Sequence, residues 1–376
     1  MSDINVLFVL SSLGGGGAER VAVNVVSALH GQGFNFSLAL MKNEGVYFEE
    51  IPSGIQVYDL EKGNGIALPV SIRRVVNLTN LVSRLKPEIV LSFLWSCNIR
   101  AILAKFFSSS KAKFIISERT YIEKDVRRLQ DKVGIAFTYR FADKIIAVSE
   151  GVRDGLIKYF KVLPDRITTI YNPFDLEEIK KKAGEPLPAE FRNLSRPWVV
   201  SAGRLSYEKN YSFLLKAYAE YKKVSGEGTF IIMGKGEMED ELKTIARKLG
   251  IENSVYWAGF QKNPYSIMKN SDVFVLGSHY EGFPNVIVEA MATGVPVIST
   301  DCPSGPSEII TNYLNGILVP VNDTEKLCKA ILEVLKNPDL RQKLIAEGYK
   351  RAADFSLDKI IPQYRNLLES FGGKNK

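Results

Sequence analysis

The stretch from Asp272 to Asp301, DVFVLGSHYEGFPNVIVEAMATGVPVISTD, constrains the fold of this chain more than any other. An apolar run of strand length opens the stretch, a loop with glycine follows, and apolar residues then recur with helical spacing before a second apolar run. The pattern predicts a strand at 272–276, a helix at 285–293 and a strand at 295–299. A strand, a helix and a second strand form the repeating unit of a parallel α/β sheet.

Two glutamates lie in this stretch with seven residues between them. Glu281 falls in the loop, whereas Glu289 falls on the helix among apolar neighbours, so we expect Glu289 to be largely buried. A buried carboxylate needs a partner, and we favour a ligand over an internal partner. Gly282 and Asn285 bracket the helix start, whose unpaired N–H groups attract anions. Ligands of open α/β sheets bind at this end of the strands.

The same alternation of strand and helix extends along the whole chain. Apolar runs of strand length occur at 4–10, 36–41, 88–93, 113–117, 144–148, 166–170, 198–202, 229–233 and 255–258, with helical patterns between them. Around 180–197 the chain becomes irregular and rich in charge and proline, as linkers are. A chain of 376 residues is long enough for two domains. We therefore predict two α/β domains with doubly wound parallel sheets.

Composition excludes several kinds of protein. No run approaches the roughly 20 apolar residues of a membrane-spanning helix, and we expect no signal peptide. The three cysteines are far apart, which disfavours a disulfide framework or zinc site and fits a reducing compartment. Two histidines are too few for a histidine-rich metal site, and neither a P-loop nor G-x-S-x-G occurs.

A glycine-rich loop, SSLGGGG at 11–17, follows the first apolar run, and residues 18–29 then have helical spacing. This order begins many nucleotide-binding units. The G-x-G-x-x-G fingerprint fails, however, because Glu19 or Arg20 occupies the place of its third glycine. An NAD(P)-dependent oxidoreductase is therefore a disfavoured alternative. The glycines indicate either a tight turn or, since four exceed that need, a ligand close to the backbone.

Cations follow the strand at 198–202, in the loop GRLSYEKN at 203–210. Cations in loops are commonly exposed to solvent without having a function, and we expect the side chains of Arg204 and Lys209 to be exposed. At the carboxyl end of a first strand, however, the two could neutralise a diphosphate, and arginine could do so bidentately. Glu208 is expected to hold them in place.

The segment from Arg73 to Lys113 has eight basic residues and one acid, Glu88, which makes its net charge 8 − 1 = +7. Interleaved apolar residues are typical of helices that face a core, but they do not explain the missing acids. An amphipathic basic surface favours an anionic membrane as partner. No nucleic-acid-binding motif occurs, so we expect no nucleic acid.

Residues 278–297 resemble the E-x7-E signature of retaining glycosyltransferases with the two-domain GT-B fold, specifically glycosyltransferase family 4. The residues that carry this ungapped match are Ser278, Glu281, Gly282, Phe283, Pro284, Glu289, Ala290, Gly294, Pro296 and Val297. GRLSYEKN is similar to the phosphate-binding motif of this family. The resemblance implies two Rossmann-like domains facing a cleft: an acceptor-side domain of residues 1–190 plus a returning helix at 356–376, and a nucleotide-sugar-binding domain of residues 191–355.

The resemblance also implies roles for individual residues. The expected catalytic residues are Arg204, Lys209 and Glu281. The expected donor-binding residues are Gly15, Gly16, Gly203, Gly234, Phe260, Gly282, Phe283, Pro284, Asn285 and Glu289. The acceptor-side candidates are Glu19, Arg20, Glu118 and Arg119. Many family members have a histidine near Glu118, so this residue is either an acceptor contact or a surface acid.

The activity implied by the resemblance is retaining transfer of a sugar from a nucleotide sugar. Similar bacterial enzymes extend polyprenyl-diphosphate-linked glycans, so we expect a UDP-linked N-acetylhexosamine as donor and a lipid-linked saccharide as acceptor, at the cytoplasmic face of the membrane. The chain has no D-x-D motif, so cations and helix N-termini would replace a metal ion, and no cofactor is expected. No carboxylate stands out as a nucleophile, which favours a same-face mechanism. A GT-B epimerase or hydrolase and a catalytically idle binding module are the alternatives.

Overall fold

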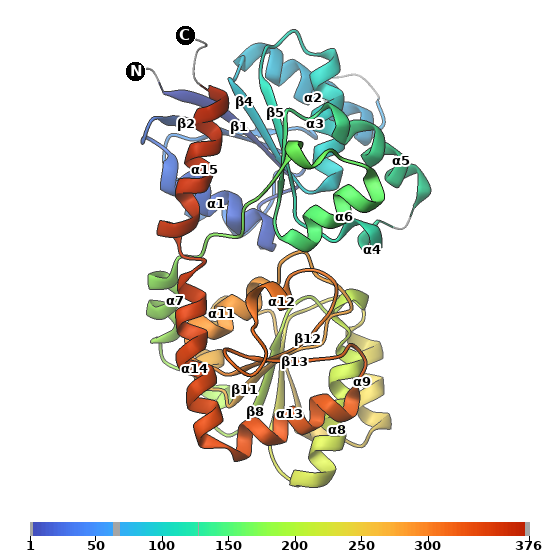
Figure 1. Ribbon diagram of the computed structural model, residues 1–376, viewed down its shortest axis with the longest axis vertical. Coiled ribbons are helices and arrows are strands. Elements are labelled where there is room, and N and C mark those ends of the chain that lie inside the picture. The colour runs from blue at the N-terminus through green and yellow to red at the C-terminus, as the bar shows by residue number, and fades with distance from the viewer. Residues whose placement is uncertain (1–2, 63–67, 127, 373–376) are drawn as a thin grey trace. The chain divides into compact units, whose positions relative to one another are not determined.

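Residues 3–62, 68–126 and 128–372 are described by the computed structural model of this protein (Figure 1). The chain divides into two compact units. The first comprises Met1–Phe174 together with Leu357–Lys376, and the second comprises Asp175–Ser356. The chain thus leaves the first unit once and returns to it with its last helix.

Seven parallel strands form the sheet of the first unit, in the order β3-β2-β1-β4-β5-β6-β7. They are β1 Ile4–Leu10, β2 Phe34–Leu40, β3 Gln56–Asp59, β4 Ile89–Phe93, β5 Lys113–Glu118, β6 Lys144–Ala147 and β7 Ile167–Thr169. Interior strands are covered on both faces, and β1 and β4 accordingly consist almost entirely of buried apolar residues. The order runs outwards from β1 in both directions, which defines a doubly wound sheet.

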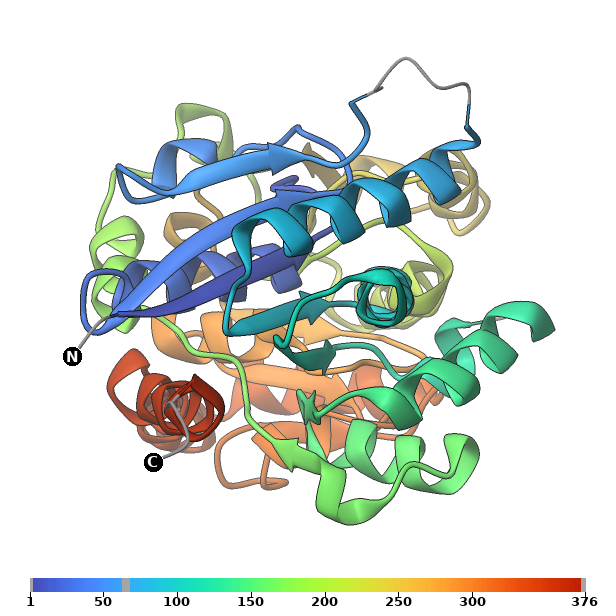
Figure 2. The same cartoon turned by 90° about the horizontal axis from the view of Figure 1, so that it is seen from above.

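Helices cover both faces of this sheet (Figures 1 and 2). They are α1 Gly17–Leu29, α2 Val70–Leu85, α3 Trp95–Phe107, α4 Ile122–Asp125, α5 Leu129–Thr138, α6 Glu150–Phe160 and α15 Leu357–Gly372, with 3-10 turns η1 Phe48–Glu50, η2 Tyr139–Phe141 and η3 Pro164–Arg166. α15 packs beside α1 and against β1 and β4. Its buried side chains Ile360, Ile361, Tyr364 and Leu368 join the core of this unit, so the last helix belongs to it by packing.

The sheet of the second unit has six parallel strands in the order β10-β9-β8-β11-β12-β13. They are β8 Trp198–Ala202, β9 Thr229–Met233, β10 Val255–Gly259, β11 Val273–Leu276, β12 Val297–Thr300 and β13 Ile317–Val319. The order again runs outwards in both directions, here from β8. The strand order reverses between β8 and β11, which are parallel, hydrogen-bonded neighbours.

The helices of the second unit are α7 Leu176–Ala183, α8 Tyr211–Ser225, α9 Glu239–Lys248, α10 Tyr265–Lys269, α11 Asn285–Thr293, α12 Pro306–Ile309, α13 Thr324–Lys336 and α14 Pro338–Ala353, with 3-10 turns η4 Ala189–Phe191, η5 Tyr207–Lys209 and η6 Glu252–Ser254. α8 packs against α9 and α13, whereas α11 packs against α7, α10 and α14. These two groups follow from crossovers of one hand that run in opposite directions from β8.

The predicted α/β class with two doubly wound parallel sheets is confirmed. Sequence reasoning missed β3, in which no residue is fully buried, and the three-residue strand β13. The division in the structure differs from the one expected at residue 190: it lies sixteen residues earlier, between Phe174 and Asp175. The reason is α7, a charged helix that packs against α10 and α11 of the second unit.

Candidate active site

The loops that leave β8 and β11 meet at the point where the strand order of the second unit reverses. Ligands of open α/β sheets bind outside the carboxyl ends of the strands at such a point, because the helices that follow the two strands diverge there to opposite faces. The loop after β8 carries Arg204 and Lys209, and the loop after β11 carries Glu281. The structure therefore brings the three expected catalytic residues to one edge of one sheet.

Three contacts tie these two loops together. Lys209 Nζ donates to Glu281 Oε1 at 2.6 Å, Asn210 Nδ2 donates to the carbonyl of Gly277 at 3.2 Å, and the backbone N–H of His279 donates to the carbonyl of Glu208 at 2.8 Å. Asn210 is buried and has a φ of +51°, a left-handed conformation that asparagine adopts more readily than most residues. Sequence reasoning missed Asn210, for which the Asn directly before a predicted helix was the available signal.

Lys209 and Glu281 form a mostly buried ion pair, since their side chains are 19% and 9% exposed. Glu281 Oε1 also accepts from Ser278 Oγ at 2.6 Å. The expectation that Glu208 holds Lys209 is wrong, because Glu208 accepts instead from Ser206 Oγ at 2.5 Å. The expectation that Lys209 is exposed is also wrong, because Glu281 draws its ammonium group into the loop junction.

Arg204 differs from Lys209 in its surroundings. Its side chain is exposed, as expected, and no carboxylate within the described ranges forms an ion pair with it. The preceding residue, Gly203, has a φ of +155°, and its carbonyl accepts from Tyr211 Oη at 3.3 Å, which fixes the backbone beside Arg204. The guanidinium group can therefore donate two parallel hydrogen bonds to one anion.

Gly203 and Gly234 allow the loops after β8 and β9 to touch. A Cβ atom on Gly234, whose φ is +146°, would lie 1.9 Å from the carbonyl oxygen of Gly203. One on Gly236 would lie 2.2 Å from the carbonyl oxygen of Leu205. Close backbone packing accounts for these glycines, independently of any ligand.

The predicted helix is α11, and Glu289 lies one turn after its first residue, Asn285. Glu289 is half-buried, so the expectation that it is largely buried is wrong. Ile287, Val288, Ala290 and Met291 take the buried sides of α11, which leaves Asn285 and Glu289, one turn apart, at the same accessible side. Tyr265 Oη lies 3.5 Å from Glu289 Oε1, at the limit of a hydrogen bond. Glu289 therefore stands beside the anion-attracting helix start.

The loop before α11 is anchored by its buried residues. The ring of Phe283 is 7% exposed and packs edge-on against Phe355, with centroids 5.2 Å apart. The carbonyl of Gly282 accepts from Ser304 Oγ at 2.9 Å, and Pro284 is buried. Phe283 can thus offer a ligand only its backbone. Phe260, after β10, is 59% exposed and presents a free apolar face.

The glycine loop of the first unit forms a turn in which the neighbouring charges have partners. Gly15 has a φ of +101°, and a Cβ atom on Gly16 would lie 2.3 Å from Glu19 Oε2. Glu19 is 8% exposed and accepts from Ser11 Oγ at 2.8 Å. The Arg20 guanidinium pairs through two nitrogens with Glu50 and lies 4.0 Å over the Tyr47 ring.

Glu118 and Arg119 are internal residues of the first unit. Glu118 has 0% exposure, so the expectation of a surface acid is wrong, and its carboxylate has no surface for an acceptor. It accepts from Tyr139 Oη at 2.6 Å and from Thr120 Oγ1 at 3.0 Å. Burial raises the pKa of Glu118 to about 7 against the effect of these hydrogen bonds. Arg119 donates to Ser117, Asn172 and Tyr364, which joins β5 to α15.

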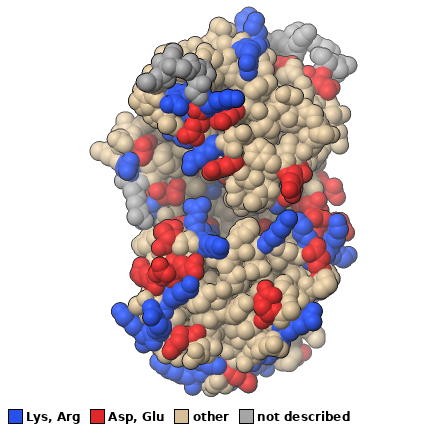
Figure 3. Space-filling view, turned by 180° about the vertical axis from the view of Figure 1, so that it is seen from behind, with Lys and Arg blue, Asp and Glu red and all other residues tan. Residues whose placement is uncertain are grey.

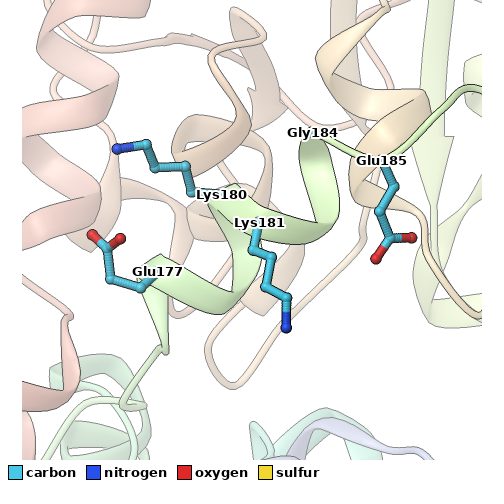
Figure 4. Close-up of a pocket in the computed structure, with 5 residues that line it drawn as sticks. All are labelled: Glu177, Lys180, Lys181, Gly184 and Glu185. Carbon is cyan, nitrogen blue, oxygen red and sulfur yellow. The ribbon is translucent and has the colours of Figure 1, made fainter.

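A hollow of about 450 Å³ lies along α7, lined by Glu177, Lys180, Lys181, Gly184 and Glu185. None of these residues is an expected site residue. Figure 4 shows the four charged side chains pointing in different directions, so they do not converge on a ligand.

The described part of the chain contains no cluster of three or more His, Cys, Asp or Glu side chains arranged to hold a metal ion. No helix in it combines the length and the apolar character that crossing a membrane requires.

Comparison with known families gives two adjoining matches. Residues 15–178 match the model of "Glycosyltransferase Family 4", and residues 187–351 match that of "Glycosyl transferases group 1". The second match contains the loops after β8 and β11. The two matches together span both units of the structure.

Curated relatives and solved structures agree with these matches. An N-acetylgalactosamine-N,N'-diacetylbacillosaminyl-diphospho-undecaprenol 4-alpha-N-acetylgalactosaminyltransferase of Campylobacter jejuni is 31% identical over 93% of this chain and 95% of its own. A second Campylobacter jejuni protein, an alpha-1,4-N-acetyl-D-galactosaminyltransferase for an undecaprenol-linked glycan, is 27% identical over 97% of this chain and 98% of its own. The crystal structure of Anabaena HepE with UDP and glucose superposes with a TM-score of 0.85 at 20% identity, covering 98% of this chain and 100% of HepE.

Proposed function

Because this chain belongs to glycosyltransferase family 4 and has the GT-B fold, we propose that it moves a sugar from a UDP-sugar, with retention of configuration, to a saccharide carried on polyprenyl diphosphate. The observation that carries the proposal is the junction of the loops after β8 and β11. There an exposed Arg204, the Lys209–Glu281 ion pair and the start of α11 lie at one strand-order reversal.

The leaving group of such a transfer is a nucleoside diphosphate, whose negative charge grows as the bond to the sugar breaks. Preorganised cations and dipoles stabilise such a charge without reorganising during the reaction. Arg204 would bind the diphosphate bidentately. Lys209, held by Glu281 at 2.6 Å, would contribute its positive charge from a fixed position. The start of α11 would add its N–H groups.

Glu281 and Glu289 would hold different parts of the donor. Glu289, on the accessible side of α11, would accept from the ribose hydroxyls. Glu281 Oε1 already accepts hydrogen bonds from two donors, whereas Oε2 accepts none from the described residues. Oε2 would therefore accept a hydrogen bond from a hydroxyl of the transferred sugar. The backbone of Gly282 and Phe283 would complete the sugar site, and the exposed ring of Phe260 would pack against the base. Gly203 and Gly234 keep the loops close enough to share one ligand.

The chemical step would proceed on one face of the sugar. A double displacement requires a carboxylate nucleophile. Both glutamates of this junction are assigned to binding, so the departing phosphate would assist deprotonation of the acceptor. With the cations in place of a D-x-D-bound metal ion, the transfer would need no metal.

The proposed acceptor is supported by the names of two relatives, which refer to undecaprenol-linked glycans and to N-acetylgalactosamine transfer. A lipid-linked saccharide and an N-acetylhexosamine donor are the corresponding proposals for this chain. Arg20 follows the glycine loop of Gly15 and Gly16 and is the acceptor-side candidate that remains partly accessible, whereas Glu19, Glu118 and Arg119 are buried and would act through the fold. The reaction would take place at the cytoplasmic face of the membrane.

A donor panel tests this function. The purified chain would be incubated with UDP-, GDP- and ADP-sugars, with and without a polyprenyl-diphosphate-linked saccharide, and release of nucleoside diphosphate would be measured. We expect acceptor-dependent release from a UDP-N-acetylhexosamine, an α-linked product by NMR, and unchanged turnover in EDTA. Acceptor-independent release of UDP and free sugar would favour the epimerase or hydrolase class instead. Loss of turnover in EDTA with rescue by magnesium or manganese would refute metal independence.

A further inference from the structure

Helix α5 of the first unit carries an apolar stripe that faces solvent. Leu129, Val133 and Phe137 are 76%, 59% and 51% exposed. They stand four residues apart, so they lie in one line along the helix. The opposite side of α5 buries Ile135 and Thr138 against its own unit. In Figure 1, α5 lies at the outer edge of its unit.

Aromatic side chains extend this stripe onto η2 and the end of α3. The ring of Phe141 contacts Phe137 and Phe106 edge-on, with centroids 5.3 Å and 4.9 Å apart. Phe106 is 46% exposed and Phe107 is 73% exposed. Soluble proteins expose single apolar side chains often but contiguous apolar surfaces rarely, and such surfaces mark contacts with proteins or membranes. We call these six residues the α5 patch: Phe106, Phe107, Leu129, Val133, Phe137 and Phe141.

Basic residues outnumber acids in the segments that form the α5 patch. Those nearest to it along the chain are Lys105, Lys111, Arg128, Lys132 and Arg140, and the acids there are Asp131 and Asp143. Asp143 is occupied, since it pairs with Lys105 at 2.6 Å and accepts from the backbone N–H of Phe114 at 2.7 Å. Arg128, Arg140 and Lys111 are exposed. An apolar stripe flanked along the chain by these exposed cations, which we call the basic rim, fits an anionic bilayer, which offers both acyl chains and negative headgroups.

The basic segment between Arg73 and Lys113 offers less free charge than its sequence indicates. Acids from outside the segment pair with Arg74, through Glu61 at 3.1 Å, and with Lys105, through Asp143. Arg73 donates to two backbone carbonyls. Part of the charge excess is therefore internal to the fold. On the face of the second unit shown in Figure 3, blue and red side chains are interspersed, so that face has no single-sign surface.

We infer that the α5 patch inserts into the boundary between headgroups and acyl chains of an anionic bilayer, with α5 lying along the membrane surface. The inference rests on the proposed function in giving the enzyme access to a lipid-linked acceptor. A second copy of this chain fits the patch less well, because a two-fold contact centred on the patch would bring the exposed arginines at its two ends, Arg128 and Arg140, close to those of the other copy.

The main test is co-sedimentation with phosphatidylglycerol vesicles at low salt. The variant Leu129→Ser/Val133→Ser/Phe137→Ser should lower the partition coefficient at least about tenfold, because three apolar side chains no longer leave water. The control Val224→Ser/Leu314→Ser replaces exposed apolar residues of the second unit and should change it less than about twofold. Equal chemical-denaturation midpoints of the triple variant and the parent establish folding. Unchanged vesicle binding by the folded triple variant overturns the inference.

Insertion depth gives a second, independent readout. In the variant Phe137→Trp, anionic vesicles should shift the emission of the new tryptophan to shorter wavelength, and brominated acyl chains should quench it. Binding without quenching would mean that the basic rim alone touches headgroups, which contradicts insertion. Sedimentation velocity covers the other occupant: a parent dimer that the triple variant converts to monomer would assign the α5 patch to a second copy.

Transfer assays separate this inference from the proposed function. With a water-soluble short-chain acceptor, the triple variant should match the parent, whereas with a long-chain acceptor in vesicles its rate should fall with its vesicle binding. If the unsubstituted protein has no transferase activity, the proposed function is refuted, but the measured binding of the α5 patch to vesicles remains valid. An equal rate of the triple variant and the parent on the vesicle acceptor counts against the α5 patch.

Discussion

Glu118 and Glu281 both lie near the carboxyl end of a parallel strand, Glu118 as the last residue of β5 in the first unit and Glu281 in the loop after β11 in the second, and their surroundings differ. Glu118 is fully buried and accepts only from neighbours within its own unit. Glu281 is paired with Lys209 at a loop junction beside an exposed Arg204, and one of its oxygens accepts no hydrogen bond from the described residues. A glutamate near the carboxyl end of a parallel strand thus supports folding in one unit and offers binding capacity in the other.

The arginines repeat this difference. Arg119 is 8% exposed and donates to Ser117, Asn172 and Tyr364. Arg204 is exposed and forms no ion pair with any described carboxylate. A guanidinium group whose donors are all used inside a protein contributes to stability, whereas one with unused donors can bind a ligand. The comparison predicts that the two units respond differently to substitution.

The largest effect should come from Arg204→Ala. It should lower kcat/KM by on the order of 10²-fold or more, the scale of losing one preorganised charge-stabilising donor. Its unfolding free energy should not change, because the side chain is exposed. Steady-state kinetics and urea denaturation measure both quantities. Arg119→Ala is the matched control and should mainly lower stability. Near-normal kinetics of Arg204→Ala would mean that the diphosphate binds elsewhere.

Glu118→Gln should change how stability depends on pH. The pKa of Glu118 is raised from 4.5 to about 7 by burial, so between these values the native state binds more protons than the unfolded state. The parent should therefore lose about 3 kcal/mol of unfolding free energy as pH rises from 4.5 to above 7. The neutral Gln side chain should lack this loss.

Urea denaturation of the parent and Glu118→Gln at pH 5 and pH 8 measures this difference. The variant should be closer to the parent in stability at pH 5 and more stable than the parent at pH 8. Glu281→Gln, in the second unit, is the comparison variant. Identical pH profiles of the parent and Glu118→Gln would show that Glu118 is not protonated within this range.

Lys209→Ala should lower the unfolding free energy by about 2 kcal/mol, in contrast to Arg204→Ala. The reason is that Glu281, whose side chain is 9% exposed, would keep its charge without its partner. Adding Glu281→Gln to Lys209→Ala should restore part of the loss, because the unpaired charge is then removed. A double-mutant cycle by chemical denaturation measures the coupling. Additive effects would mean that the ion pair does not contribute to the fold.

The smallest effect should be a difference between substitutions of Glu281 and Glu289 in the second unit. Glu289→Gln should weaken UDP binding about tenfold, the scale of one lost charged hydrogen bond. Glu281→Gln should leave UDP affinity within a few-fold and lower transfer instead. Calorimetry with UDP alone and kinetics with the full donor measure the two quantities. If Glu281→Gln abolishes UDP binding while Glu289→Gln does not, the assignment of ribose and sugar is reversed.

By itself the sequence determined the class of fold, the strands of ordinary length and the motifs of the site. Apolar runs such as 4–10 and 198–202 became β1 and β8 at the same residues, because a strand that is covered on both faces is apolar over nearly all of its length. Helix α11 also begins and ends as predicted, at Asn285 and Thr293. Periodicity reports the surroundings of one element, and for these elements that was sufficient.

Only the tertiary structure decided which of these residues meet. Lys209 and Glu281 are 72 positions apart in the sequence and pair because β8 and β11 are neighbours at the point where the strand order reverses. Glu118 was expected to be either an acceptor contact or a surface acid, because charged residues are usually exposed, but Tyr139 and the turn at Thr120 provide the donors that allow its burial. The α5 patch was equally undetectable, since an apolar stripe on a helix normally faces a core. Strand order, partner and exposure depend on contacts between distant segments, which no local pattern encodes.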